Sequence, residues 1–412
     1  MLTQEKISVR ESRIEEKKEN VISLWALQNI AREILCKTTY DFSSEKAPSL
    51  FSCCRVPVSV PEQKNVQVHN NIDTRKNFYK NLVSCNSVWN CPLCACKISS
   101  DRSKQIKISL QNWYKKTVCH KTAFVTYTMP HNIGQSLADV RKIFMSARRK
   151  MSKQLSLSKT PSFIPYNEIC ENFGVVGTLT GIELTYGNNG WHLHSHEIFF
   201  LSWPVTEEEV KKMQYLLMLA WKRALQKEGV SIDEKAFSLR SVVVELFDEE
   251  DQDQISKYIT KFSGWSVADE LVKSFVKKGH AGNYSIWDFL RIILEKAQGY
   301  KKYIFLFREY SQEMKGKRQV FFSKGMAELV KYRNIDIVLD PLISVLLGQL
   351  SDQDWFRIVQ NKHRRKFLQM VTDEGFESAI IKIKNLKLIN KKYKKYGEKN
   401  GKVRFRLQTD VC

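Results

Sequence analysis

The stretch that decides the fold reads Trp191-His192-Leu193-His194-Ser195-His196-Glu197 and continues into the apolar run Ile198-Phe199-Phe200-Leu201. Side chains alternate between the two faces of a β-strand, so a strand here projects the three histidines from one face. Neutral imidazole is the commonest metal ligand among protein side chains. The stretch therefore predicts a strand that carries a divalent metal site; the alternative is a chance cluster on a half-exposed strand.

The residues before this strand predict a β-hairpin. Gly187-Asn188-Asn189-Gly190 is typical of a tight turn, and residues 173–186 form the expected partner strand. Further strands are expected at residues 123–128 and 241–247, and helices at residues 136–155 and 206–227. This order of elements predicts an α+β fold, a split βαβ (ferredoxin/RRM-like) antiparallel sheet core flanked by helices.

The charge of the chain points to a polyanionic partner. A net charge of +22 on 412 residues favours nucleic acid, and membrane or ribosome binding is the alternative on charge alone. The hydrophobic fraction of 43% indicates a folded protein. No apolar run has the length needed to cross a bilayer, and the charged N-terminus resembles no signal peptide. We therefore expect a cytoplasmic protein with no membrane partner.

Composition along the chain predicts four parts. They are an N-terminal helical segment at residues 1–49, a cysteine-rich zinc-binding module at 50–118, a central domain at 119–290, and a basic, mostly helical C-terminal region at 291–412. The tail from Lys362 onward holds 15 Lys and Arg against 5 Asp and Glu. Its interleaved aromatic residues suit phosphate contact and base stacking, and a solvated basic tail is the alternative.

The cysteines of the second part have the spacing of metal ligands. Cys91 and Cys94 are separated by two residues, which lets both thiolates bind one tetrahedral Zn²⁺. Cys85 and either Cys53 or Cys54 would complete a closed structural site. A reducing compartment favours metal binding over disulfides, and the alternative is a set of free buried thiols.

A tyrosine and a lysine lie one helical turn apart in a predicted helix. Tyr258 and Lys261 share nearly the same helical face. A phenol has a pKa of about 10 and is a poor nucleophile unless a cation or a metal-bound phosphate stabilises the phenolate. A histidine-bound metal next to this tyrosine would favour attack on a phosphodiester and a covalent phosphotyrosine product. Taken alone, the spacing also arises by chance on surface helices.

Five segments together resemble, in order, the plasmid rolling-circle replication initiators of the HUH endonuclease superfamily. The segments lie at residues 53–57, 85–98, 124–128, 183–196 and 258–261. The likeness continues at residues 265–270 and 316–325, so it covers roughly residues 50–325. The resemblance implies an HUH-type fold and metal-dependent, site-specific DNA nicking and strand transfer at a plasmid origin through a 5′-phosphotyrosine. It also implies a bacterial protein encoded by a plasmid or another mobile element.

The resemblance assigns the metal ligands residue by residue. His194 and His196 match the metal-binding pair, and His192 matches the histidine that precedes it. Because Ser195 stands where an apolar residue is expected, the pair could instead be His192 and His194. Glu183 is the expected third ligand, since Mg²⁺ or Mn²⁺ favours carboxylate oxygen; a solvated strand carboxylate is its alternative.

The resemblance also assigns the nucleophile and the zinc ligands. Tyr258 matches the nicking tyrosine. The zinc-type cysteines are Cys53, Cys85, Cys91 and Cys94, whereas Cys54 and Cys96 fall where small residues are usual. One position departs from the pattern.

The position that departs from the family's pattern is that of a carboxylate. In such initiators this carboxylate activates water for a second cleavage, which terminates replication. It is expected one helical turn before the tyrosine, where this chain has Gln254. Asp253 and Asp251 lie five and seven residues before Tyr258, and Asp251 is nearer the same helical face. We favour Asp251, and a role at the helix N-terminus, favourable with the helix dipole, is the alternative for both.

Two other functions remain open from the sequence. An HUH relaxase or transposase of a mobile element would use the same cut, and a non-catalytic zinc-dependent DNA-binding regulator would use no cut at all. No Walker motif is present, so we expect a host helicase and a host DNA polymerase as partners besides the single-stranded or supercoiled DNA.

Overall fold

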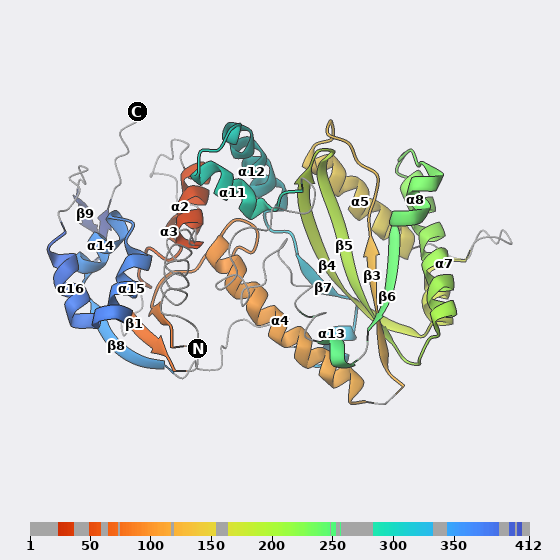
Figure 1. The fold of residues 1–412 in the computed structure, drawn as a ribbon, viewed down its shortest axis with the longest axis horizontal. Coiled ribbons are helices and arrows are strands. Elements are labelled where there is room, and N and C mark those ends of the chain that lie inside the picture. Colours follow the sequence, from red (N-terminus) through yellow and green to blue (C-terminus); the bar gives the residue numbers. More distant parts are fainter. Residues whose placement is uncertain are drawn as a thin grey trace, which may run out of the picture. The chain divides into compact units, whose positions relative to one another are not determined.

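The computed structural model shows a mixed α+β protein with antiparallel sheets (Figure 1). It describes residues 24–36, 49–58, 65–72, 75–116, 119–153, 164–247, 249–252, 256, 283–332, 344–386, 395–399 and 402–405. The predicted residues Tyr258 and Lys261 lie outside them. Among the described residues, no helix combines the length and apolarity required to cross a membrane.

The chain packs into two compact units. We call residues 1–45 and 85–337 the five-stranded unit, and residues 46–84 and 338–412 the three-stranded unit. The four-part division expected from the sequence stays a prediction, and these units divide the chain at other residues.

The five-stranded unit is built on one antiparallel sheet in the order β6-β3-β5-β4-β7. Its strands are β3 (Lys121–Tyr127), β4 (Val175–Gly187), β5 (Gly190–Leu201), β6 (Val242–Phe247) and β7 (Val320–Phe322). The antiparallel α+β prediction is confirmed, and β4 and β5 form the predicted hairpin. Gly190 has a φ of +87°, and a Cβ there would lie 2.9 Å from the Cα of Ile133, so the turn requires glycine.

The two faces of this sheet have different covers. The histidine face of β5 continues into Ile198 and Phe200, which pack against α4 (Pro92–Tyr114) in an apolar core with Trp113. The opposite face carries Leu193 and Phe199 and is covered by α5 (Leu137–Ser152), α6 (Tyr166–Asn172) and α7 (Glu207–Gln226). On this face, the C-terminal half of β5 packs into the apolar core, and the N-terminal half, which we call the polar half of β5, carries the three histidines.

Capping residues explain where the covering helices begin. Ser136 accepts a hydrogen bond from the amide of Asp139 at the start of α5. Thr206 and Glu209 form a reciprocal capping box at the start of α7, where three glutamates favour the helix dipole. The other elements of the unit are α2 (Leu24–Leu35), α8 (Glu234–Arg240), the 3-10 helix η1 (Glu249–Asp251), α11 (Ile286–Leu294), α12 (Tyr300–Met314) and α13 (Met326–Leu329).

The three-stranded unit joins two segments that lie far apart in the sequence. Its sheet has the order β2-β1-β8 and is formed by β1 (Val66–Asn71), β2 (Asn77–Lys80) and β8 (Ser344–Leu350). Its other elements are α3 (Ser49–Ser52), α14 (Asp352–Gln360), α15 (Arg364–Glu374), α16 (Phe376–Lys384), β9 (Lys395–Lys399) and β10 (Lys402–Phe405). The C-terminal region, expected to be mostly helical, therefore also supplies strands.

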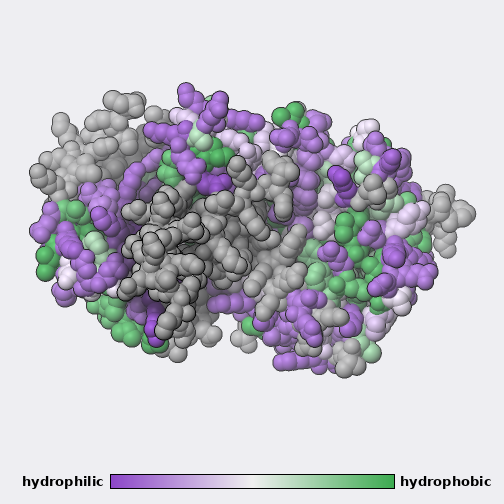
Figure 2. Space-filling view, viewed as in Figure 1, coloured by the Kyte–Doolittle hydropathy of each residue, from purple (hydrophilic) through white to green (hydrophobic). Residues whose placement is uncertain are grey.

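Apolar side chains reach the surface of both units. Figure 2 shows apolar residues gathered over β6, where Val243 and Leu246 are exposed. On β8, Val345, Leu346 and Leu347 are exposed as well. Elsewhere the visible face of the described residues is largely hydrophilic, as expected for a strongly charged chain.

Packing behind β5 predicts the stability of the sheet. Phe199 is fully buried on the face opposite the histidines, so Phe199→Ala should lower the free energy of unfolding by about 3–5 kcal/mol. Phe305 on α12 is 68% exposed, and Phe305→Ala should change the free energy of unfolding by less than about 0.5 kcal/mol. Denaturant unfolding of both variants measures the difference, and equal effects would contradict the packing described.

Candidate functional site

The pairing of β5 with its neighbours fixes what surrounds His196. Thr126 on β3 is the register partner of His196. Glu183 on β4 is the register partner of His194, which lies two residues before His196 on β5. Glu183 Oε2 lies 2.7 Å from Nε2 of His196, and Thr126 Oγ1 lies 3.0 Å from its Nδ1. With Glu183 ionised, Nε2–H donates to the carboxylate and Nδ1 accepts from the hydroxyl. His196 is therefore held in one ring orientation from both sides.

The other two histidines contact each other. Nε2 of His194 lies 3.1 Å from Nδ1 of His192, and their ring centroids are 3.8 Å apart. A fourth imidazole, His131, stacks on His192 at 4.4 Å between centroids. His131 was missed in the sequence analysis, and its place directly after the predicted strand 123–128 is the signal that points to it.

Burial keeps the imidazoles of His192 and His194 neutral at pH 7, because it lowers the pKa of both. Desolvation, together with His194 and His131, lowers the pKa of His192 to about 3. Desolvation lowers the pKa of His194 to about 4, with His196 and His131 adding to the effect and Glu183 opposing it. Neutral imidazole is the form that binds a metal ion, so both rings are in the ligand form at neutral pH.

One atom of this group lacks a protein partner. Nδ1 of His194 is buried and has no hydrogen-bond partner among the described residues. A buried polar atom without a partner costs free energy, so a missing ligand such as an ion is one physical explanation. The carboxylate on this strand pair suits Mn²⁺ or Mg²⁺, and the imidazoles beside it are the commonest ligands of metal ions in proteins. The donor chemistry therefore fits the predicted metal.

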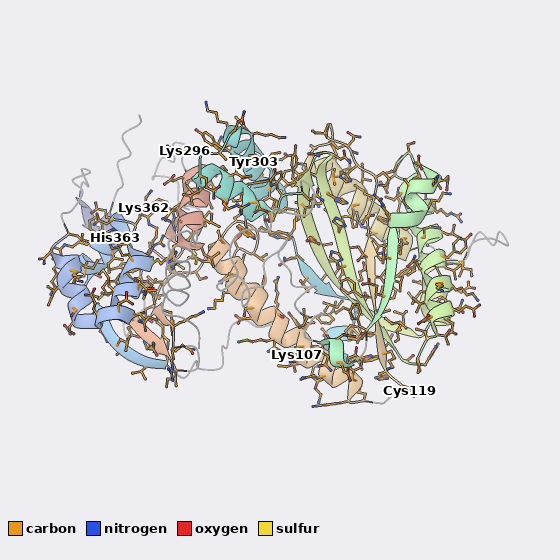
Figure 3. The ribbon with its side chains drawn as sticks, in the orientation of Figure 1. Lys107, Cys119, Lys296, Tyr303, Lys362 and His363 are labelled. Atoms are coloured by element: carbon orange, nitrogen blue, oxygen red, sulfur yellow. The ribbon has the colours of Figure 1, made fainter. Side chains whose placement is uncertain are left out.

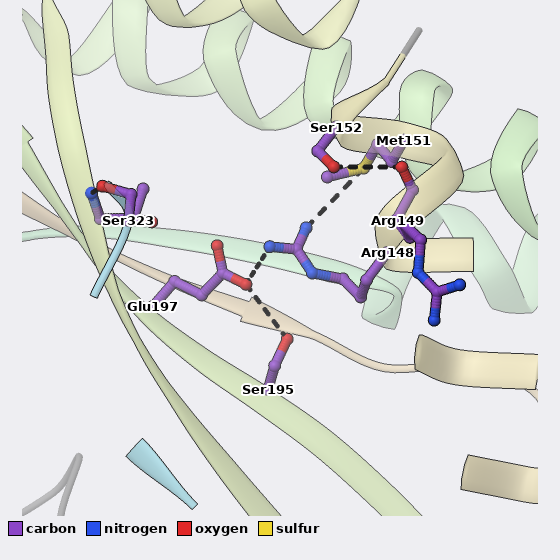
Figure 4. Close-up of polar contacts among 8 residues, drawn as sticks. Arg148, Arg149, Met151, Ser152, Ser195, Glu197 and Ser323 are labelled. Atoms are coloured by element: carbon purple, nitrogen blue, oxygen red, sulfur yellow. Dashed lines mark hydrogen bonds and ion pairs between the residues drawn. The ribbon is translucent and has the colours of Figure 1, made fainter. Parts of the chain in front are cut away.

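A buried ion pair lies behind the histidines on the opposite face of β5 (Figure 4). Glu197 is fully buried, accepts a hydrogen bond from Ser195 at 3.5 Å and pairs with Arg148 of α5. The guanidinium carbon of Arg148 also lies 4.4 Å from the centroid of the Tyr127 ring. Burial alone would lower the pKa of Arg148, but Glu197 raises it above its ordinary value. The pair ties β5 to α5 directly behind the candidate metal ligands.

This ion pair yields a prediction with a neighbouring control. Arg148→Ala leaves the Glu197 carboxylate buried without its counter-charge, so it should lower the free energy of unfolding by about 3–5 kcal/mol. Arg149 is exposed, and Arg149→Ala should change it by less than about 0.5 kcal/mol. Chemical denaturation compares the two variants, and a loss of stability in both or in neither would refute the role of the pair.

The predicted zinc cysteines come together. Ligand atoms of Cys53, Cys85, Cys91 and Cys94 all lie within 4.8 Å of one another, and this cluster can hold a metal such as zinc. A tetrahedron with Zn–S distances of about 2.3 Å has S–S edges of about 3.8 Å, which matches this spread. The sulfur atoms of Cys85 and Cys94 lie 3.5 Å apart.

Local structure explains how two of these thiols are presented. Cys91 is the N-cap of α4, Pro92 occupies its first turn, and Cys94 follows one turn along. The side chain of Gln28 donates a hydrogen bond to Cys91 Sγ at 3.3 Å. Cys54 has a left-handed backbone with a φ of +53° and lies outside the cluster. The structure thus groups Cys53 rather than Cys54 with the other three thiols.

A metal at this cluster predicts a specific loss on substitution. Cys91→Ser should reduce bound zinc, measured by elemental analysis of the purified chain, from about one ion per chain to a small fraction of that. It should also lower the midpoint of thermal unfolding, since the lost binding free energy stabilises the fold. Cys119 is exposed and outside the cluster, so Cys119→Ser should change neither quantity. Equal zinc content in all three proteins would refute the site.

The remaining predicted residues are not brought to the histidines by the described structure. Asp251 ends η1, which follows β6 and contacts α4. Gln254, Asp253, Tyr258 and Lys261 lie outside the described residues. Their roles stay predictions.

Comparison with known proteins identifies relatives of the chain. A family model described as "Replication protein" matches residues 77–346. The chain is similar to Protein rep of Streptomyces lividans, with 24% identity over 323 residues that cover 66% of this chain and 68% of that protein. No solved structure matches. The matched segment contains the histidines of β5 and three of the four clustered cysteines.

Proposed function

The chain belongs to the replication protein family, and from this premise we propose that it initiates plasmid replication by nicking DNA at a rolling-circle origin. The observation that carries the proposal is the polar half of β5, where neutral imidazoles, the Glu183 carboxylate and the unpartnered Nδ1 of His194 share one sheet face. In this proposal the five-stranded sheet is the HUH-type split βαβ core, although no solved structure matches it.

The histidines and Glu183 would hold Mg²⁺ or Mn²⁺ next to the scissile phosphate. The cation would supply Lewis-acid chemistry by withdrawing charge from the phosphate oxygens. His196 enters this role already oriented, because Thr126 contacts its Nδ1. Second contacts of this kind fix the ring of a ligating histidine. Nε2 of His196, which donates to the Glu183 carboxylate, would exchange that hydrogen bond for the cation, so that both groups become ligands. The ligands proposed are His194, His196 and Glu183, with His192 as the alternative partner of His194.

Tyr258 would act as the nucleophile. Its phenol oxygen gives up its proton to solvent and forms a bond to phosphorus while the bond from phosphorus to the 3′ oxygen breaks, and the departing 3′ oxygen takes up a proton from solvent. Lys261, three residues after Tyr258 in the sequence, would stabilise the phenolate, and Asp251 would activate water for the terminating cleavage. The tyrosyl phosphate ester keeps the energy of the broken phosphodiester bond. The strand can therefore be rejoined later without a nucleotide cofactor.

The products define the partners of this reaction. The free 3′ hydroxyl would prime a host DNA polymerase, and the 5′ end would stay attached to Tyr258. The sequence carries no Walker motif, so unwinding would come from a host helicase.

The covalent intermediate provides the test. The purified chain, Mn²⁺ and supercoiled DNA of its own replicon should give a protein–DNA adduct that survives a denaturing gel. Tyr258→Phe and the double variant His194→Ala plus His196→Ala should each reduce the adduct at least about a hundredfold. Tyr215 on α7 is 58% exposed, and Tyr215→Phe should leave the yield unchanged.

The outcomes separate the proposal from its rivals. An adduct of equal yield in Tyr258→Phe would move the nucleophile to another residue. No adduct with the unsubstituted chain, together with intact DNA binding, would favour the non-catalytic regulator.

A further inference from the structure

The three-stranded unit contains a helix, a short turn and a second helix. α14 ends at Gln360, and α15 begins at Arg364. Between them, Lys362 has a left-handed φ of +57°, and the amide of His363 donates to the carbonyl of Ile358 at 2.9 Å. This bond pattern closes α14 with a Schellman turn, which redirects the chain within three residues. Figure 3 labels Lys362 and His363 in this turn.

One side of α15 is fixed to the unit along its length. Phe367 and Val371 are buried in the apolar core of the three-stranded unit. The hydroxyl of Tyr79 donates to the carbonyl of Arg364 at 2.7 Å, near the start of the helix. Near its end, the side-chain amide of Asn77 donates to Thr372 Oγ1 at 3.0 Å. α15 is therefore a rigidly mounted helix whose orientation on β2 is set at both ends.

The other side of α15 is exposed and basic at its start. Arg365, Lys366 and Gln369 recur at helical spacing and are exposed, and Lys362 in the preceding turn is exposed as well. Between Asp354 and Asp373 the chain has five basic residues and no acidic one. These basic residues are Arg357, Lys362, Arg364, Arg365 and Lys366. The acidic residues of the helix, Asp373 and Glu374, lie in its last turn, so the charge falls from one end of α15 to the other.

We propose that the N-terminal half of α15 binds duplex DNA by entering its major groove. The major groove admits an α-helix, and the second helix of a helix-turn-helix places its N-terminal residues against base edges. Arg365 and Gln369 lie one turn apart. Arg365 carries two parallel donors that suit guanine, and the amide of Gln369 carries one donor and one acceptor that suit adenine. Lys362 and Lys366 would contact phosphates and fix the position of the helix on the duplex.

The charge gradient selects the end of the helix that approaches DNA. Phosphates attract the basic start of α15 and repel Asp373 and Glu374 at its end, so the N-terminal half lies closest to the groove. The exposed face of α15 described above carries no aromatic residue. Single-stranded DNA is usually bound by stacking bases on aromatic side chains, so this face favours a duplex.

This inference extends the proposed function and rests on it only for the identity of the duplex as a replication origin. The histidine face of the five-stranded unit would carry the chemistry, and α15 of the three-stranded unit would select the duplex.

The test measures duplex binding by the full-length chain. A fluorescein-labelled DNA duplex of mixed sequence is titrated with the unsubstituted protein and with Arg365→Ala plus Lys366→Ala at several salt concentrations. The double variant should bind at least about tenfold more weakly, and its slope of log affinity against log salt should be shallower by about 1, because the Lys366 contact with a phosphate is lost. An unchanged midpoint of thermal unfolding shows that the variant is folded.

A matched variant removes the same charge elsewhere. Lys211 and Lys212 on α7 are exposed, and Lys211→Ala plus Lys212→Ala should weaken duplex binding less than about twofold. Equal losses in the two double variants would overturn the proposal in favour of diffuse electrostatic attraction. A larger loss with the labelled single strand than with the duplex would overturn it as well.

The test is independent of nicking. Duplex affinity is measured without Mn²⁺ and without a covalent product, so a failed adduct assay leaves this result standing. A failed duplex assay likewise leaves the adduct assay standing.

Discussion

The alternation of side chains along β5, held in register by β3 and β4, is the constraint on which the candidate chemistry depends. The register places Glu183 and Thr126 beside the histidines, and it places Glu197 against Arg148 on the other face. A slip of one residue would exchange the two faces of the strand. It would move the histidines to the face that α5, α6 and α7 cover, and it would move Glu197 away from its counter-charge. The buried ion pair therefore specifies the same register that the metal site requires.

The parts of the fold that depend on local sequence were predictable. The Gly-Asn-Asn-Gly turn and the alternating histidines define the β4–β5 hairpin, and the caps at Ser136 and Thr206 define where α5 and α7 begin. The parts that depend on distant contacts were not. β1 pairs with β8 across some 280 residues of chain, and no local pattern connects the two strands. The place of His131 after a predicted strand is a weak local signal, and the folded chain adds that it stacks on His192.

The cysteine cluster and the candidate histidine site differ in what the sequence could establish. Cysteine spacing and the resemblance together named Cys53, Cys85, Cys91 and Cys94, and the structure groups the same four. The histidine site needed geometry that spacing does not contain. The unpartnered nitrogen of His194 belongs to both candidate pairs. Glu183 contacts His196, which favours the pair His194 and His196, whereas His192 and His194 contact each other. Tyr258 and Lys261 rest on the resemblance.

The central claim is that the histidine face of β5 binds a divalent cation. Electron paramagnetic resonance of Mn²⁺ added to the full-length chain tests it directly, because imidazole nitrogens couple to the manganese spin. The account predicts such nitrogen couplings in the unsubstituted chain and in His363→Ala, and their disappearance in His194→Ala plus His196→Ala. Couplings that persist in that double variant, or a spectrum of free aqueous Mn²⁺ with the unsubstituted chain, would contradict it.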